Sequence, residues 1–326
     1  MGPSRSSRSG FAGFLCALGA TGLWGLSFVI PLFLPGVSPW DISLGRYLIF
    51  GMVGTLFIAR SRVAGVTLTL PQWGWAFVFA ATGYYGTYVA MVYAISLSGP
   101  ALLTLVMGLT PMCVAVIGNM RSREVAFSAF LVPLFLSAAG LALANLSRHG
   151  EGLSMRHLGL GLTASFTGLA LMSFYLVANI FFLKNNPRIK PLLWANAVGA
   201  AAMAFALLAL AVKLLLGGGL PWQGTQTSAT AFWTGTALLG IGISWFGGVL
   251  WNRANALLSP AVAGQCVVFW PISGIIYACI LDKKFPAAWE AAGILMVFAG
   301  VLWGLAAIAA GSRSRAGAAH PRRPQR

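Results

Sequence analysis

The sequence predicts an all-α polytopic membrane protein with ten transmembrane helices, arranged as two inverted five-helix repeats. Three observations predict this fold class: the length of the apolar segments, a composition that suits lipid, and a weak internal repeat. A helix needs about 20 residues to cross a hydrocarbon core of about 30 Å, and about ten apolar segments are long enough. The connections between them are short, so the sequence has no room for a soluble catalytic domain.

The apolar segments also divide the chain. A first repeat covers 11–147, a linker 148–156 follows, and a second repeat covers 157–310. The terminal segments, 1–10 and 311–326, are rich in Ser, Gly, Pro and Arg, and we expect both to be disordered. The expected spans are 11–34, 40–60, 71–97, 100–120, 125–147, 157–182, 190–216, 230–255, 260–281 and 287–310.

Composition supports the membrane interpretation, with 58% hydrophobic residues, 8% charged residues and a mean hydropathy of +0.83. The net charge of +16 does not indicate a nucleic-acid partner, because the basic residues lie at the ends of apolar segments and in the tails. An even number of spans puts both termini on one side. That side carries 15 of the 21 Lys and Arg residues and the opposite side 4, which predicts cytosolic termini in a plasma, or bacterial inner, membrane.

The internal repeat appears in two registers. Residues 21–28 resemble 167–174 at a shift of 146, and residues 73–143 resemble their partners at a shift of 160. In the second register Pro100 matches Pro260 and Pro111 matches Pro271. Five is an odd number of spans, so two such halves have opposite orientations in the membrane, a recurring construction of secondary transporters.

The paired prolines have different predicted roles. Pro100 and Pro260 each open a span, where a missing N–H costs little. Pro111 and Pro271 lie about 16 Å further along each helix, near the bilayer midplane. A proline there frees the carbonyl four residues earlier, so we expect these two to mark conformational hinges. A kink that serves packing alone is the alternative.

These features together resemble the drug/metabolite transporter superfamily, EamA type. The resemblance covers about 11–310 and implies a central cavity lined by spans one, three, four, six, eight and nine. In one place the chain departs from it, since Lys283 and Lys284 stand where the first half has Arg123 and Glu124. The residues that carry the resemblance are Trp24, Gly25 and Ser27, the run Leu44-Gly45-Arg46-Tyr47, Pro100 and Pro260 with the alanine after each, Pro111, Pro271, Glu124 and Gly140.

Polar and aromatic groups lie at middle depth in the spans expected to line the cavity. A hydroxyl, indole or amide in hydrocarbon needs a partner, so these groups should face the interior, either as packing contacts between helices or as substrate ligands. The expected substrate-binding residues are Trp24, Ser27, Arg46, Tyr84, Tyr88, Phe174, Trp245, Gln265 and Trp270.

Arg46 is the basic residue furthest inside a predicted span, about 9 Å from the helix start at Trp40. A charge at that depth is costly and indicates function, here a contact with a substrate carboxylate. The alternative is an arginine that snorkels to the interface, with Asp41 as its partner. Lys213 is expected to snorkel.

The sequence predicts neither a catalytic site nor a metal or cofactor. All five acids and all three histidines lie at span ends or in loops or tails, away from the midplane where proton relays are built. The four cysteines lie within apolar spans and lack metal-ligand or redox spacing, and no P-loop is present.

We therefore expect a secondary transporter that exports small organic metabolites, among them aromatic or bulky neutral amino acids and drug-like compounds. A homodimer is compatible with this organisation. The alternatives are an intramembrane enzyme on lipid substrates and a non-transporting scaffold.

Overall fold

A computed structural model describes residues 5–63, 67–122, 128, 131–146, 155–258, 263 and 266–318. The regular elements within these residues are helices of α, 3-10 or π type. In chain order they are α1 (Arg5–Gly25), η1 (Leu26–Phe28), η2 (Ile30–Phe33), α2 (Pro39–Val63), α3 (Leu70–Phe79), η3 (Ala80–Gly86), α4 (Thr87–Met107), α5 (Thr110–Ser122), α6 (Leu131–Leu146), α7 (Met155–Asn185), α8 (Pro191–Leu215), α9 (Ala229–Ala237), η6 (Leu238–Phe246), α10 (Gly247–Leu257), α12 (Phe269–Asp282) and α13 (Ala288–Ala318).

Six stretches of the described residues are long and apolar enough to cross a membrane. They correspond to the predicted spans one, two, three, six, seven and eight, and they are Gly10–Phe28, Pro39–Arg60, Leu70–Pro100, Met155–Asn185, Pro191–Leu215 and Ala229–Leu257. The chain is therefore an all-α membrane protein, as predicted. The other four spans, and with them the total of ten, stay a prediction, because that part of the described chain has only shorter apolar helices.

The helices extend into both terminal segments that we expected to be disordered. Helix α1 begins at Arg5 and α13 continues to Ala318, so part of each basic tail is helical. The expected linker 148–156 lies almost entirely outside the described residues, with α7 beginning at Met155.

The start of the predicted fourth span is visible inside α4. Gly99 has φ 79° and ψ 165°, a conformation that favours glycine, and it separates the helix before it from the one that Pro100 opens. Pro100 therefore begins a new helical segment, as the sequence predicted. Its counterpart Pro260 lies outside the described residues.

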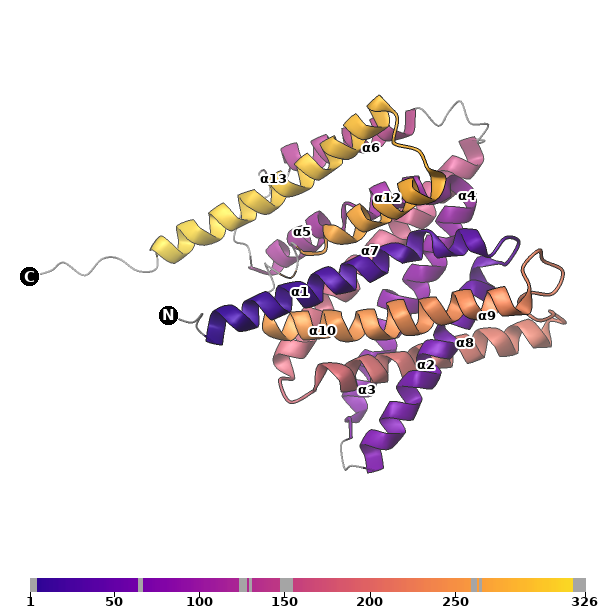
Figure 1. The fold of residues 1–326 in the computed structure, drawn as a ribbon. Helices are drawn as coiled ribbons and strands as arrows, with labels where there is room; N and C mark the ends of the chain where they lie inside the picture. The colour runs from indigo at the N-terminus through magenta and orange to yellow at the C-terminus, as the bar shows by residue number, and fades with distance from the viewer. Residues whose placement is uncertain are drawn as a thin grey trace, which may run out of the picture.

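Helix pairs connect the two halves of the chain (Figure 1). The pair α2 and α8 pack together, as do α6 and α13, which lie side by side at one edge of the bundle. Helix α1 packs on α10 and α12, while α7 packs on α4 and α5. In Figure 1, α1 begins and α13 ends at the same end of the bundle, which we call the terminal end.

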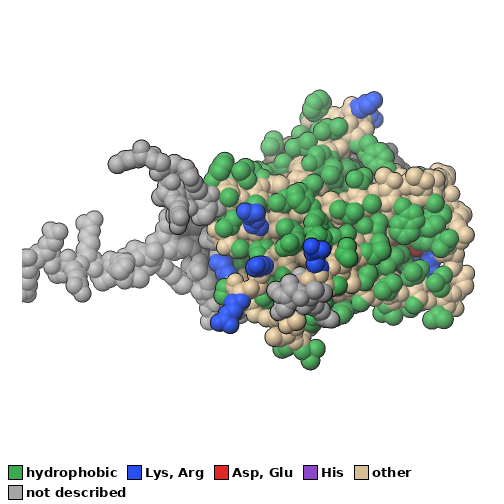
Figure 2. Space-filling model, turned by 60° about the horizontal axis from the view of Figure 1, so that its bottom comes forward, with side chains coloured by type: hydrophobic (Ala, Val, Ile, Leu, Met, Phe, Trp, Pro, Cys, Tyr) green, Lys and Arg blue, Asp and Glu red, His purple; other side chains and the backbone are tan. Residues whose placement is uncertain are grey.

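The surface of the bundle is apolar along its flank. Large side chains such as Leu56, Phe135 and Leu295 are more than two-thirds exposed, which suits a lipid environment. Figure 2 shows hydrophobic side chains over the visible flank and most Lys and Arg side chains at the terminal end. The side of the membrane on which the termini lie stays a prediction.

Two π-helical segments interrupt the long helices of the central bundle. They are η3, between α3 and α4, and η6, between α9 and α10. A shift of 160 residues carries the whole of η3 onto part of η6. Such segments are rare and are often found at functional sites.

Candidate functional site

A small cavity of about 30 Å³ lies inside the bundle where both halves of the chain meet. We call it the central cavity. The first half contributes Trp24, Ser27, Arg46, Gly83, Tyr84, Thr87, Tyr88 and Met91, and the second half contributes Met172, Tyr175, Ile243, Ser244 and Trp270.

Arg46 is the charged residue of the central cavity, and it is only 6% exposed. Its Nε donates to Ser244 Oγ at 2.7 Å, so the contact joins α2 to the π-helical segment η6. Its guanidinium carbon lies 3.9 Å from the centroid of the Tyr88 ring and 5.3 Å from that of Tyr47. Arg46 thus points into the bundle, unlike an arginine that snorkels to the interface.

Tyrosines form the wall beside Arg46. The Tyr47 hydroxyl donates to the carbonyl oxygen of Tyr84 at 2.7 Å, and the hydroxyls of Tyr84 and Tyr175 lie 3.3 Å apart. The Phe50 and Tyr84 rings stack with centroids 5.4 Å apart. Gly83 makes this arrangement possible, because a Cβ atom there would lie 2.1 Å from Cγ of Tyr175.

Indole rings form another part of the lining. The Trp24 ring lies 5.7 Å from Trp270 and 5.2 Å from Trp251, measured between centroids. The Tyr88 hydroxyl and the Trp270 Nε1 are buried and have no hydrogen-bond partner within the described chain. The central cavity is therefore lined by a cation and by unpaired hydrogen-bond donors.

Six of the nine predicted binding residues line this cavity. They are Trp24, Ser27, Arg46, Tyr84, Tyr88 and Trp270. Phe174 does not, since it is 44% exposed and lines a different hollow. Trp245 donates from Nε1 to Asn196 Oδ1 at 2.8 Å and stacks on Phe57, away from the cavity. Gln265 lies outside the described residues.

Other polar groups at middle depth join helices to each other. Asn179 donates from Nδ2 to Asn252 Oδ1 at 3.1 Å, and it accepts from Trp194 Nε1 at 2.8 Å. All three residues are buried, so this network has the packing role that the sequence left as an alternative.

Asp41 and Lys213 pair with each other, which rules out Asp41 as the partner of Arg46 and does not contradict the expected snorkelling of Lys213. Lys213 Nζ lies 2.6 Å from Asp41 Oδ1, so Lys213 joins α8 to α2 by an ion pair. The other carboxylate oxygen of Asp41 accepts from the Ser38 hydroxyl at 2.8 Å. Asp41 is therefore occupied by Lys213 and is not the partner of Arg46.

Both midplane prolines lie just after a break between helices. Helix α4 ends at Met107, and Pro111 is the second residue of α5. Helix α12 begins at Phe269, after a turn at residues 267–268, and Pro271 lies in its first turn. The freed carbonyls are occupied locally, since that of Met107 accepts from the Thr110 hydroxyl and that of Val267 from the Trp270 N–H at 3.1 Å. The breaks are therefore present, and each freed carbonyl accepts a hydrogen bond from within the chain.

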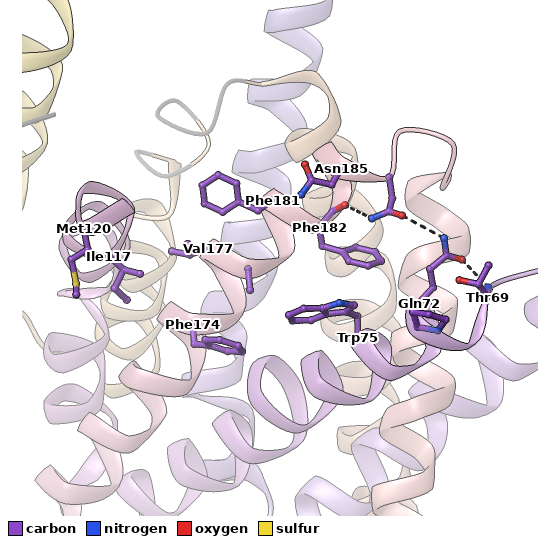
Figure 3. Close-up of a pocket in the computed structure, with 13 residues that line it drawn as sticks. Thr69, Gln72, Trp75, Ile117, Met120, Phe174, Val177, Phe181, Phe182 and Asn185 are labelled. Carbon is purple, nitrogen blue, oxygen red and sulfur yellow. Dashed lines mark hydrogen bonds between the residues drawn. The ribbon is translucent and has the colours of Figure 1, made fainter. Parts of the chain in front are cut away.

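A larger hollow of about 770 Å³ lies between α3, α5 and α7 (Figure 3). We call it the terminal cleft, because it lies at the start of α3 and the ends of α5 and α7. Ile117 and Met120 form one wall and Trp75 and Phe182 the other, with Phe174 deepest along α7. From Asn186 to Phe174 the helix rises about 18 Å.

The mouth of the terminal cleft is polar. Gln72 Nε2 donates to Asn186 Oδ1 at 3.4 Å, and the Thr69 N–H donates to Gln72 Oε1 at 2.9 Å. Asn186 Nδ2 in turn donates to the Phe182 carbonyl at 2.9 Å. Figure 3 shows this chain of hydrogen bonds, which connects the start of α3 to the end of α7.

Helix α7 separates the two hollows. Phe174 faces the terminal cleft and its neighbour Tyr175 lines the central cavity, as expected for consecutive residues of a helix. One side of α7 therefore borders the cleft and another borders the cavity.

The sequence did not single out several residues of the central cavity. Ser244 is the partner of Tyr84 at the 160-residue shift, so the repeat itself could have identified it. Met91, Met172 and Ile243 carry no polar signal that distinguishes them from ordinary packing residues. For metals, no group of three His, Cys, Asp or Glu side chains within the described residues could hold an ion.

Comparison with known proteins gives a curated relative and a structural neighbour. No family model matches the chain. The inner membrane protein YtfF of Escherichia coli (strain K12) is 26% identical over 307 residues, which cover 89% of this chain and 94% of that protein. A solved chain described as "Crystal structure of protein" has a TM-score of 0.62 at 20% identity and covers 93% of this chain and 96% of its own. The second likeness shows a shared fold and nothing about activity.

Proposed function

We propose that the protein is a secondary transporter that exports small organic metabolites by alternating access. The proposed substrates include aromatic or bulky neutral amino acids and drug-like compounds. We further propose that it resides in the bacterial inner membrane with both termini in the cytosol. The similarity to the inner membrane protein YtfF supports this location, together with the apolar flank of the bundle.

The observation that carries the proposal is the central cavity with its buried arginine. A charged side chain is expensive inside a membrane protein and usually marks a ligand or ion pathway. Arg46 comes from the first half of the chain, and its hydrogen-bond partner Ser244 comes from the second. A site between two repeats suits alternating access, because relative motion of the halves changes which side it faces.

The helix contacts support a correspondence between the two repeats, because each contact in one arrangement has an equivalent when the halves are interchanged. If span one corresponds to span six and span three to span eight, then the pair α1 and α10 is equivalent to the pair α7 and α4. The contacts of α1 with α12 and of α7 with α5 are equivalent in the same way. The paired segments η3 and η6 support the same correspondence. These relations are also what the resemblance to the EamA-type drug/metabolite transporters implies.

We propose facilitated diffusion or exchange as the mode of transport. The residues of the central cavity include an arginine, tyrosines and hydroxyl groups, but no carboxyl or imidazole group. Buried carboxylates and histidines are the usual proton carriers in coupled transporters. In proteoliposomes, an imposed pH gradient alone should not drive uphill accumulation of substrate.

Flux into proteoliposomes tests the proposal. Exchange of radiolabelled phenylalanine should exceed that of protein-free vesicles, and Tyr88→Ala or Trp270→Ala should lower it several-fold, because each removes a ring of the cavity. Trp289→Ala, which removes an exposed indole, is the matched control. Absence of flux for a panel of amino acids, drugs and sugars would overturn the transporter proposal. A strong preference for sugars would overturn the aromatic-substrate part alone.

A further inference from the structure

Arg46 lacks a carboxylate partner within the described chain. Of the described acids, Asp41 is paired with Lys213, and Asp282 and Glu290 belong to the region around the α12–α13 connection. A buried guanidinium without a counter-charge is unfavourable, so the structure leaves room for an anion supplied from outside.

The orientation of Arg46 leaves its terminal nitrogens for that anion. Ser244 occupies Nε, and the Tyr88 ring lies against the guanidinium. No hydrogen bond of ordinary geometry joins either terminal nitrogen to an acceptor among the described residues, although the Tyr88 hydroxyl lies close enough to the guanidinium to interact with it. The free edge of a guanidinium matches the two oxygens of a carboxylate.

Two further donors face the same cavity. Tyr88 and Trp270 are each 2% exposed, and neither the Tyr88 hydroxyl nor the Trp270 Nε1 has a partner in the described chain. An indole N–H donates only, so its missing partner is an acceptor. The Arg46 cation and these two donors together define a site for the oxygen atoms of a hydrogen-bond acceptor.

We propose, on the basis of the transport function above, that the central cavity binds the carboxylate group of the transported metabolite. Arg46 and Trp270 contact its oxygens, and Tyr88 completes the site. The cavity of about 30 Å³ has room for one or two water-sized groups, and a carboxylate head is of that size. The rest of the metabolite requires the walls to move, and Met91 and Met172 are flexible side chains suited to this.

The proposal also predicts what the site rejects. A purely cationic compound would bring a second positive charge to Arg46 at low dielectric, with no lining carboxylate to compensate. Substrates should therefore be organic anions or zwitterions. Amine-only drugs should be poor ligands.

A competition assay on the purified full-length protein in nanodiscs tests this site. Radiolabelled 3-phenylpropionate is bound to the protein at neutral pH. Unlabelled 3-phenylpropionate, its amide, phenethylammonium and chloride are then tested separately as competitors. We expect the carboxylate to bind about tenfold or more tightly than the amide, because a charge-assisted pair is lost with the amide. Phenethylammonium should compete worst.

Variants identify the residues responsible. Arg46→Gln should remove the preference for the carboxylate, Arg46→Lys should keep part of it, and Trp270→Phe should weaken the carboxylate but not the amide. Tyr88→Phe retains the ring and serves as a second, conservative variant if Arg46→Gln fails to fold. Arg60→Gln removes an exposed cation of the same helix, and it should leave the preference unchanged.

Each result decides the proposal. Equal affinity for acid and amide, an unchanged preference in folded Arg46→Gln, or no saturable binding to folded protein would overturn it. Chloride that competes better than 3-phenylpropionate would assign the cavity to an inorganic anion and overturn the carboxylate assignment. Selective binding without flux would instead refute transport while leaving the carboxylate site standing.

Discussion

At the scale of single residues, burial divides the polar groups of the bundle into two kinds. Asn179, Asn252 and Trp194 satisfy one another, and such groups stabilise helix packing. The Tyr88 hydroxyl and the Trp270 Nε1 are equally buried but have no partner in the described chain. Both kinds look alike in the sequence, because a residue's type and depth do not reveal whether its partner belongs to the protein.

The asparagine network provides the first prediction. Asn179→Leu leaves the Trp194 Nε1 and the Asn252 amide without their partners, which should cost about 1 to 2 kcal/mol of stability. Thermal unfolding in detergent measures the loss. Thr163→Val is the control, since its hydroxyl is exposed and bonds only to the Gly159 carbonyl. A loss no larger than that of the control would contradict the packing role of the network.

At the scale of elements, the apolar segments predicted the helices well, but their interruptions only in part. The prolines located the breaks before α5 and within α4, because proline lacks an N–H and clashes with the preceding turn. The π-helical segments η3 and η6 carry no such signal. Each contains two glycines, which weaken a helix without specifying its pitch. Segment η3 packs against α7 and α8, whereas η6 packs mainly against α2.

The second prediction concerns η3. Gly83→Ala would place a methyl group against the Tyr175 ring, so the two elements must separate or the ring must turn. Overpacking of this kind typically costs about 1 to 3 kcal/mol, and here it also displaces two tyrosines of the cavity. We expect lower stability and weaker substrate binding, measured by thermal unfolding and by competition binding.

Gly74→Ala is the matched control for that substitution. It lies in α3, in the same long helix, and a Cβ atom there meets no atom within 4 Å. Alanine favours a helix over glycine by about 1 kcal/mol, so stability should stay equal or rise. Equal losses from both substitutions would show that the close contact with Tyr175 is unimportant.

The third prediction concerns the midplane breaks. In Pro111→Ala the new N–H could donate to the Met107 carbonyl and compete with the Thr110 hydroxyl for it. A more continuous helix should slow substrate exchange in proteoliposomes several-fold, with little change in the amount of folded protein. Pro271→Ala should have the same effect. Pro191→Ala, at the ordinary start of α8, is the control. Unchanged exchange in both variants would favour breaks that serve packing alone.

At the scale of the whole molecule, the two ends of the bundle differ. The terminal cleft opens between α3, α5 and α7 at the terminal end. The corresponding elements of the other half are close together: a Cβ atom at Gly25 would lie 2.1 Å from Ser273 Oγ, and one at Gly274 would lie 2.4 Å from the Phe28 ring. Phe28 is fully buried. The repeat predicted two equivalent halves, but no sequence pattern indicates which half is open, because the choice depends on a small free-energy difference between conformations.

The last prediction follows from this asymmetry. In a variant whose four native cysteines are replaced by serine or alanine, Val177→Cys in the terminal cleft should react with a membrane-impermeant thiol reagent from the side that labels Ser314→Cys. We predict that this side is the cytosol, because the termini and most basic residues are expected there. Phe28→Cys should be unreactive without substrate and should react from the opposite side when substrate is added, because alternating access opens that end.

Labelling of Ser314→Cys from outside intact cells would reverse the orientation. Failure of substrate to change either Val177→Cys or Phe28→Cys labelling would contradict the rocking of the two halves, because a site that serves both sides in turn must change its exposure at both ends.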